Sequence, residues 1–348
     1  MSIMQWIPMS RTKTMSKHLE TAQNLKDKLL EAENILLFPH IGIDGDAVGS
    51  CCALIWALRK KGKNAYALYE EDMPGNLMFL TDDPEGKPCF TSDRDIISDE
   101  DLDVAMAVDC GELKRFPAYR DKFLGAPVKL VLDHHGTSLK EPLGDFNMID
   151  PDAAAAGVLM YWLLSLIEGA VIDRYIGQCL FSAIVTDTGR FQYSNTNREC
   201  WEIMSELSSW GCDFVRASTE LYESKREEQV RITAYAINKM TVSEDGRWAV
   251  TTLSKEELDA MGVRAGETDE IVGEMRSVKG VEVSVFLREV ENNVIRVSYR
   301  SKYFVDVASL ASKHGGGGHL RAAGATLYMS LAEAERIILD DLKNYFSN

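Results

Sequence analysis

The sequence predicts an α/β protein in two parts: a doubly wound, mainly parallel sheet, then a helical linker and a smaller mixed α/β domain. In the first half, short apolar runs alternate with helix-length segments, a pattern typical of parallel strands covered on both faces. Residues 196–245 are strongly charged and have helical spacing. From Trp248 onward, alternating strands and a hairpin take over. We therefore expect domains at 15–195 and 246–348, joined by a linker at 196–245.

Each expected element follows from its local pattern. Short apolar runs bounded by turn residues predict strands at 34–38, 65–69, 104–108, 128–132 and 146–149, and later at 248–253, 281–288, 294–301 and 321–329. Helical spacing of apolar residues predicts helices at 17–33, 47–61, 116–124, 153–167, 172–186, 268–278, 305–313 and 332–346. The longest apolar run, 153–167, is too short to span a bilayer, so we interpret it as a buried helix.

Composition limits the classes of function. Acidic residues number 54 and basic residues 38, a net charge of −16, which argues against a protein that grips long duplex nucleic acid. Short anionic substrates remain compatible, because bound divalent cations would supply positive charge locally. The seven cysteines form no CxxC pair, which is typical of reduced thiols in a cytoplasmic protein, and we expect no membrane partner. Met15 precedes an amphipathic stretch, so residues 1–14 are a candidate extension outside the fold.

Acidic and imidazole side chains follow the strands of the first domain where each strand ends. They are His40, Asp44 and Asp46 after the first strand, Asp109 after the third, Asp133, His134 and His135 after the fourth, and Asp187 at the end of a later helix. Taken singly, each has an ordinary explanation; an Asp-Gly-Asp sequence, for instance, is usually only a turn. Together they predict a site, because ligands in open α/β sheets bind beyond the carboxyl ends of the strands. Of the six histidines, only His18 falls in a plainly solvated helix.

The chemistry of this set favours metal ions. Five carboxylates gathered in one cleft would repel one another strongly without cations. Two divalent ions that share one Asp would resolve the repulsion, and such pairs serve phosphoryl hydrolysis. Asp187 adds to the case, because an acidic residue at a helix C-terminus opposes the helix dipole unless a cation lies nearby. The oxygen-rich, partly imidazole set favours Mn²⁺, with Mg²⁺ or Co²⁺ as alternatives, over structural zinc.

The second domain contributes a glycine run and an arginine. Gly315–Gly318 is not a P-loop, since no Lys-Ser/Thr follows, but its amides could approach an anion with His319 at the exit. Alone, a flexible turn explains it better. Arg300 could bond a phosphate or stack on a base, and it could equally be a surface arginine.

In chain order, these residues resemble the motifs of the DHH phosphoesterase family. The motifs are His40-x3-Asp44-Gly45-Asp46, Asp109, Asp133-His134-His135, Asp187-Thr188-Gly189, Arg300-Ser301 and the glycines before His319. The second domain resembles the GGGH-bearing DHH-associated domain, and the whole is most similar to the bacterial oligoribonuclease and pAp phosphatase branch. Ile43 departs from the family, which commonly has proline there, and Gly315 is an extra glycine. The resemblance implies a metal-binding first domain, a substrate-binding second domain and an active site in the cleft between them.

The resemblance also implies a role for each residue. Asp109 would bridge two cations, with His40 and Asp44 holding one ion and Asp46, His134 and Asp187 the other. His135 would face the scissile phosphate, and Asp133 would orient a histidine. Substrate contacts would come from Arg300, Ser301, Gly316, Gly317, Gly318 and His319.

We therefore expect a hydrolase that cleaves short oligoribonucleotides and dinucleotides such as pApA to nucleoside 5′-monophosphates, by two-metal activation of a bridging hydroxide. Removal of the 3′-phosphate of pAp is a second expected activity. The alternatives are an exopolyphosphatase, a cyclic-dinucleotide phosphodiesterase, and a metal-stabilised nucleotide sensor without turnover. A homodimer is left open by the sequence.

Overall fold

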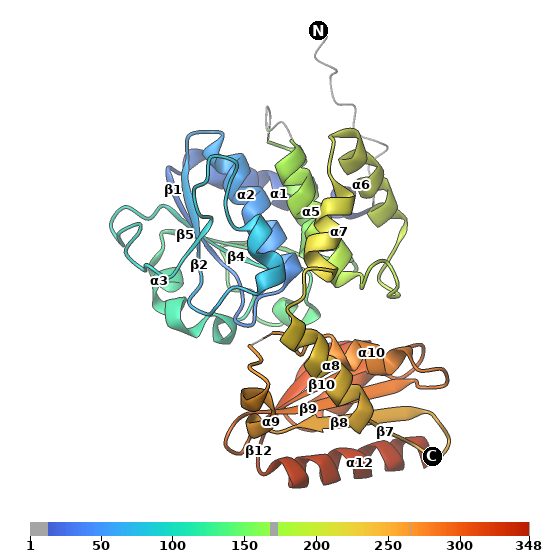
Figure 1. The fold of residues 1–348 in the computed structure, drawn as a ribbon. Coiled ribbons are helices and arrows are strands. Elements are labelled where there is room, and N and C mark those ends of the chain that lie inside the picture. The colour runs from blue at the N-terminus through green and yellow to red at the C-terminus, as the bar shows by residue number, and fades with distance from the viewer. Residues whose placement is uncertain (1–12, 168–172, 265, 348) are drawn as a thin grey trace. The chain divides into compact units, whose positions relative to one another are not determined.

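The computed structural model describes residues 13–167, 173–264 and 266–347, and the chain divides into two compact units at Ser224/Lys225 (Figure 1). The division falls inside the predicted linker, 196–245, and the domain limits at 195 and 246 remain predictions. Within the described ranges, no helix is long and apolar enough to cross a membrane.

The first unit is built on a parallel sheet of six strands in the order β3-β2-β1-β4-β5-β6. The strands are β1 (Asn34–Phe38), β2 (Asn64–Leu68), β3 (Phe90–Thr91), β4 (Val104–Val108), β5 (Val128–Asp133) and β6 (Phe146–Ile149). The predicted parallel sheet is confirmed. Its short edge strand β3 was not predicted from the sequence.

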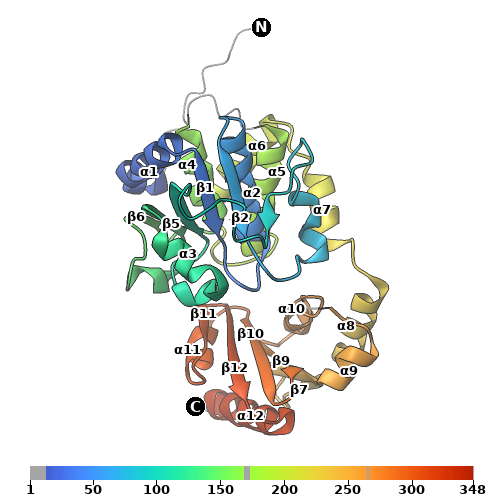
Figure 2. The same ribbon diagram turned by 90° about the vertical axis from the view of Figure 1, so that its left-hand side faces the viewer.

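Helices cover both faces of this sheet. They are α1 (Lys13–Glu31), α2 (Gly45–Arg59), α3 (Arg120–Gly125), α4 (Ala156–Ser165), α5 (Arg174–Asp187), α6 (Arg198–Ser209) and α7 (Phe214–Tyr222), with 3₁₀ turns at Gly75–Leu80, Leu113–Arg115, Pro117–Tyr119 and Gly136–Leu139. Alternate strand residues point to opposite sides, so Leu37 and Met106 pack in the core under α1, α2, α4 and α5. Leu36 and Ala105 pack on the other face with Phe123 of α3. Figure 2 shows α3 on this face of the sheet.

Helix α1 differs from its predicted character. His18 exposes only 8% of its surface, and its Nε2 lies 3.0 Å from Asp150 Oδ2, so it is a buried structural residue and not a solvated one. The Thr14 hydroxyl donates to Glu199 at 2.6 Å, so the helix joins the fold before Met15. The rest of the predicted extension, residues 1–12, lies outside the described residues, as does the predicted helix start at 172.

The second unit is a mixed sheet in the order β11-β12-β10-β9-β8-β7, in which only β8 and β9 pair in parallel. The strands are β7 (Thr241–Val242), β8 (Trp248–Leu253), β9 (Val283–Glu291), β10 (Val294–Ser301), β11 (Gly317–His319) and β12 (Ala322–Tyr328). The helices are α8 (Glu227–Lys239), α9 (Lys255–Ala260), α10 (Ile271–Ser277), α11 (Val307–Ser312) and α12 (Leu331–Ser347). Helices α11 and α12 pack on one face, while α8 and α10 cover the other. Figure 1 shows α12 on one side of this sheet and α8 and α10 on the other. The predicted smaller mixed α/β domain is confirmed.

The glycine run is more ordered than a flexible turn. Gly315 has φ +72° and follows the end of α11, a left-handed position that favours glycine. At Gly316 a Cβ would lie 2.1 Å from the carbonyl oxygen of Gly324. The next residues form β11, which pairs antiparallel with β12. Glycine is thus required here by close backbone contact.

Candidate active site

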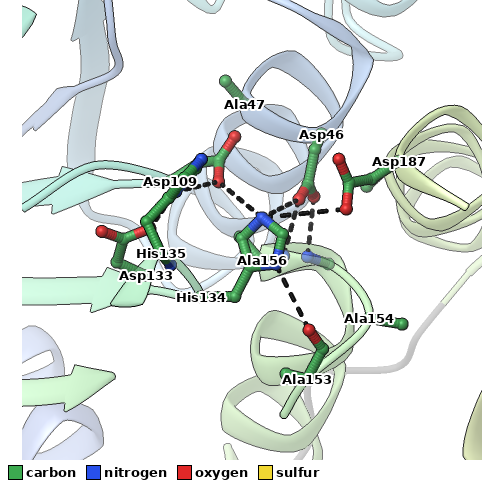
Figure 3. Close-up of polar contacts among 12 residues, drawn as sticks. Asp46, Ala47, Asp109, Asp133, His134, His135, Ala153, Ala154, Ala156 and Asp187 are labelled. Atoms are coloured by element: carbon green, nitrogen blue, oxygen red, sulfur yellow. Dashed lines mark hydrogen bonds and ion pairs between the residues drawn. The ribbon is translucent and has the colours of Figure 1, made fainter. Parts of the chain in front are cut away.

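The predicted ligands of the first unit gather beyond the carboxyl ends of its central strands. His40 follows β1, Asp109 follows β4, and Asp133 ends β5 and leads into His134 and His135. Asp44 caps the N-terminus of α2, Asp46 lies in its first turn, and Asp187 is the last residue of α5. Figure 3 shows Asp46, Asp109 and Asp187 around the imidazole of His134. Because parallel strands end at one edge of the sheet, residues far apart in sequence converge there.

His40, Asp44 and Asp109 form the first group of ligand-type atoms, all within 4.8 Å of one another. His40 Nε2 lies 3.4 Å from Asp109 Oδ2 and 3.7 Å from Asp44 Oδ2. Its other ring nitrogen, Nδ1, is 3.0 Å from the carbonyl oxygen of Ile41. That carbonyl accepts a hydrogen bond from Nδ1–H, so the Nε2 lone pair faces the carboxylates, as in metal-binding histidines.

Asp46, His134 and Asp187 form the second group, again with ligand-type atoms within 4.8 Å. His134 Nε2 lies 3.6 Å from Asp46 Oδ2 and 3.8 Å from Asp187 Oδ2. Its Nδ1 lies 3.3 Å from the carbonyl oxygen of Ala153 (Figure 3). In His134, as in His40, a backbone carbonyl accepts a hydrogen bond from Nδ1–H and the Nε2 lone pair faces the carboxylates.

Asp109 lies between the two groups. Its Oδ2 faces His40, while its Oδ1 is 3.4 Å from His134 Nε2. The side chain is 1% exposed, and Oδ1 accepts no hydrogen bond from the described residues. The backbone is left-handed, at φ +59°, which is uncommon for any residue but glycine. A buried carboxylate oxygen without a donor, between two sets of ligand atoms, fits a bridging metal ligand.

Asp133, unlike the residues of the two groups, directs its carboxylate toward His135. Its Oδ1 accepts hydrogen bonds from His135 Nδ1 at 2.7 Å and from the His135 amide at 3.1 Å, and its Oδ2 accepts one from the Ser138 hydroxyl. Burial opposes it, but the Asp133 carboxylate raises the pKa of His135 above its ordinary value. Asp133 thus holds one histidine ring in place, as the orienting role requires.

The electrostatics of the cluster also suit a cation. Burial, together with the charges of Asp46 and Asp44, raises the pKa of Asp109 well above its ordinary value. Burial also raises the pKa of Asp46 to about 7, and the charge of Asp187 adds to that rise. Burial lowers the pKa of His40 and of His134, which keeps both imidazoles neutral at pH 7. Neutral imidazoles and carboxylates short of positive charge are what a divalent ion needs.

Four supporting hydrogen bonds, donated by three residues, were not predicted from the sequence. The amides of Ala156 and Gly157, at the start of α4, donate to Asp46 at 2.6 and 2.8 Å. Asn195 donates from Nδ2 to the carbonyl of Asp187 at 3.1 Å and to its carboxylate at 3.4 Å. Backbone amides leave no sequence signal, and a single Asn in a loop carries only a weak one.

Ile43, the departure from the family pattern, has a local explanation. It is 5% exposed, and its amide donates to the hydroxyl of Tyr69 at 3.2 Å. Proline could not make this bond, because it has no N–H group. The bond ties the turn that holds Asp44 to the loop after β2, so hydrogen bonding fixes the turn where proline would have done so.

In the second unit, the predicted substrate residues lie at the ends of β10 and β11. Arg300 is half-buried and donates to the carbonyl of Tyr299 at 3.0 Å. Ser301 is fully buried, and its hydroxyl donates to the carbonyl of Val305 at 2.6 Å, so it shapes the loop that follows. Gly317 and Gly318 lie in β11 with the backbone of His319, whose side chain lies outside what the structure describes. Contact of all these residues of the second unit with substrate stays a prediction.

Comparison with known proteins places the chain in a family. Residues 34–197 match the DHH family, N-terminal domain, and residues 245–348 match the DHHA1 domain. A protein of Thermus thermophilus, named bifunctional oligoribonuclease and PAP phosphatase NrnA, is 31% identical over 313 residues, which cover 89% of each chain. This chain belongs to the DHH family. The DHH-family protein described here is accordingly an enzyme that hydrolyses phosphoester bonds.

Two further relatives span almost the whole DHH protein. One, from Bacillus subtilis, carries the same name and is 29% identical over 310 residues, covering 88% of this chain and 93% of its own. The other is the crystal structure of an exopolyphosphatase-related protein from Bacteroides fragilis, with a TM-score of 0.84, 28% identity, and coverage of 94% of this chain and 96% of its own. The two-domain arrangement of a DHH sheet followed by a DHHA1 domain is thus shared along the full length.

Proposed function

We propose that this enzyme hydrolyses short oligoribonucleotides to nucleoside 5′-monophosphates and removes the 3′-phosphate of pAp, with two divalent cations at the Asp109 cluster. The observation that carries the proposal is the pair of ligand groups that meet at the buried carboxylate of Asp109. The substrate class is supported by two relatives, both named bifunctional oligoribonuclease and PAP phosphatase, which are similar over almost the full length.

The residues that would hold the cations follow from the two groups. His40, Asp44 and Asp109 would hold one, and Asp46, His134 and Asp187, with Asp109 shared, would hold the other. Carboxylates with neutral imidazoles favour Mn²⁺, and the same ligands accept Mg²⁺ or Co²⁺. Such a pair of cations supplies a nucleophile at neutral pH and neutralises charge on the phosphoryl group.

His135 is the proposed proton donor to the substrate. Its side chain is 31% exposed, whereas the ring of His134 is almost fully buried. Because Asp133 holds Nδ1 and raises the pKa of the ring, Nε2 is the atom that would donate to a phosphoryl oxygen. Asp133 acts through His135 as a positioning residue.

The limits of the substrate are part of the proposal. A net charge of −16 disfavours long nucleic acid, whereas one to a few phosphates can be neutralised locally by cations. Arg300, Ser301 and the glycine run with His319 would bind the far end of the substrate. A cytoplasmic location and a homodimer remain predictions.

The proposal is tested by a product time course with Mn²⁺ on labelled di-, tri- and pentaribonucleotides, pAp, inorganic polyphosphate and a cyclic dinucleotide. We expect mononucleotides from the oligonucleotides, adenosine monophosphate from pAp, and little turnover of the other two. An Asp109→Asn variant controls for contaminating nucleases. Polyphosphate turned over faster than any oligonucleotide would favour the exopolyphosphatase alternative, and selective cleavage of the cyclic dinucleotide would favour the cyclic-dinucleotide phosphodiesterase; either result would overturn the proposal.

A further inference from the structure

Two aromatic side chains stand exposed on the loop between β10 and α11. Tyr303 is 75% exposed and Phe304 is 65% exposed. Single exposed apolar residues are common, but two large neighbouring aromatic rings on one short loop mark an interaction site. Neither residue belongs to the motifs that link this chain to its family.

The backbone of this loop is held by a buried carboxylate. Glu282, 4% exposed, accepts hydrogen bonds at Oε1 from the amides of Tyr303, Phe304 and Val305 at 3.0, 2.8 and 3.0 Å. Arg321 adds bonds to the carbonyls of Val305, at 2.7 Å, and of Tyr303. The two rings are therefore presented by a fixed backbone, which lowers the entropy lost when they contact a ligand.

Positive charge surrounds the same loop in a protein of net charge −16. Arg300 donates to the carbonyl of Tyr299 in β10, Lys302 to that of Val278 at the end of α10, and Arg321 to that of Val305 in the loop. In the described part of the chain, none of these three cations forms an ion pair with a carboxylate. Cations that lack acidic partners, next to exposed rings, match a ligand that carries both a phosphate and an aromatic group.

The loop is also joined to the end of the glycine run. The Ser301 amide donates to the carbonyl of Arg321, and the Val307 amide donates to the carbonyl of Leu320, both at 3.0 Å. Leu320 directly follows β11, and Figure 2 shows α11 beside β11 at this edge of the second sheet. The loop that carries the two rings is thus hydrogen-bonded to the residues that directly follow the glycine strand, within the second unit.

We propose that Tyr303 and Phe304 form a stacking platform for a nucleobase of the short oligonucleotide substrate, while Arg300 and Lys302 face the phosphate next to that base. The proposal rests on the function proposed above and adds the subsite that distinguishes a nucleotide from other phosphoesters. Stacking tolerates every base, because each has a π-face, so the platform selects for a base and not for a sequence.

The test compares Tyr303→Ala/Phe304→Ala with wild type on pApA and on an abasic dinucleotide of the same phosphate spacing. Stacking contributes about 1–3 kcal/mol per base, so KM for pApA should rise about 5- to 150-fold, while kinetics on the abasic dinucleotide stay unchanged. Tyr328→Ala is the matched control: Tyr328 is 79% exposed but pairs with Val294, at the far end of β10 from Arg300. Equal losses on both substrates, or an equal loss in Tyr328→Ala, would overturn the platform.

A second measurement does not depend on turnover. The fluorescence of a dinucleotide containing 2-aminopurine should be quenched on binding wild type and not on binding the double variant. Quenching without hydrolysis of any oligonucleotide would refute the proposed function and leave the platform standing. Quenching that survives the double substitution would overturn the platform. Sedimentation of wild type and of the double variant tests whether the rings instead contact a second copy of the chain. A wild-type dimer that dissociates in the double variant would assign the rings to that interface and overturn the platform.

Discussion

Asp109 combines three features that each cost free energy in a folded protein. Its carboxylate is 1% exposed, it lies among other carboxylates, and its backbone has φ +59°. A shared cation would remove the first two costs, since it neutralises the carboxylates and satisfies the oxygen that lacks a donor. The left-handed backbone then aims the side chain between the two groups of ligands.

Replacement of Asp109 by Asn tests this reading. Loss of even an outer partner of a metal ligand costs about 10- to 100-fold in metal affinity or activity, so loss of a shared ligand should lower activity by at least about 100-fold. Mn²⁺ content, measured by elemental analysis, should fall by at least one ion per chain. At high pH the metal-free variant should be at least as stable as metal-free wild type, because the Asp109 carboxyl group of wild type must ionise there among other carboxylates. Unchanged Mn²⁺ content would remove Asp109 from the bridging position.

Asp44 has two roles that substitutions can separate: it caps a helix, and it is a proposed metal ligand. Its Oδ1 accepts from the amides of Asp46 and Ala47, at 3.0 and 3.1 Å, which caps α2, while its Oδ2 faces His40. Asp44→Asn keeps the cap and should change stability by only a few tenths of a kcal/mol, whereas Asp44→Ala should cost about 1 kcal/mol. Both should lose most activity. Urea unfolding and pApA hydrolysis measure the two effects, and full activity in Asp44→Asn would leave Asp44 with the cap alone.

At the residue scale, the sequence indicates the ligand types but not the contacts that orient them. Asp and His at strand ends are visible because carboxylate and imidazole are unusual where a buried strand stops. The partners of the two histidine Nδ1 atoms are backbone carbonyls, which any residue could supply. The turn after Asp187 could not be predicted either, because Arg190 and Phe191 both have φ near +60°, a conformation that neither residue favours.

At the scale of elements, the first and last residues of the strands were predicted more closely than those of the helices. Strands β1, β4 and β6 begin and end at the predicted residues. The sequence signal is clearest for β4, which is apolar throughout and buried along its whole length. Helix α4 begins at Ala156, although the alanines from Ala153 onward favour an earlier start. The extended backbone before Ala156 lets the Ala153 carbonyl reach His134 and leaves the amide of Ala156 for Asp46, so the site overrides helix propensity.

The close pairing of β11 with β12 gives a prediction for the glycine run. A Cβ at Gly316 would lie 2.1 Å from the Gly324 oxygen and 2.7 Å from the Ala325 Cβ, whereas a Cβ at Gly317 would meet nothing within 4 Å. Gly316→Ala should therefore destabilise the second unit by about 1–3 kcal/mol. Gly317→Ala is the control and should stay within about 0.5 kcal/mol. Thermal unfolding followed by circular dichroism measures both, and equal melting temperatures would show that the strand can move aside.

For the whole molecule, the buried acids predict how stability without metal depends on pH. The pKa values of Asp46, Asp109 and His135 are raised in the folded protein, so stability from these groups is lost as pH rises through those values. His40 and His134, with lowered pKa values, act in the opposite direction, but only below about pH 6.5. Above pH 6.5, where His40 and His134 no longer contribute, stability in chelator should therefore still fall as pH rises, at first because Asp46, with a pKa of about 7, loses its proton.

Urea unfolding at several pH values, with chelator and with Mn²⁺, measures this dependence. Mn²⁺ should raise stability, and the gain should grow with pH, because the ion favours the ionised carboxylates. An Asp46→Asn/Asp109→Asn variant should show a flatter dependence in chelator. A slope of the opposite sign in metal-free wild type would mean that these carboxyl groups ionise normally without a cation.

The two-part organisation was predictable because the pattern of strands changes near Trp248. The division between units was harder to place, since helices on both sides of Ser224 are equally charged and amphipathic. Leu207 and Leu221 pack in the core of the first unit, while Ile232 packs in the second. Tertiary packing, and not local composition, decides to which unit each helix belongs.

The proposed ligands are spread from His40 to Asp187, and strands β2 to β6 and helices α2 to α5 lie between these two residues in the sequence. During biosynthesis, the group of His40, Asp44 and Asp109 can form before α5 is made, whereas the group of Asp46, His134 and Asp187 can form only after α5 has left the ribosome and packed. The second proposed cation would then bind late in maturation, and a truncated or stalled chain would emerge with one proposed cation site at most. An enzyme that lacks its proposed cations would be recognisable by a stability that falls at alkaline pH.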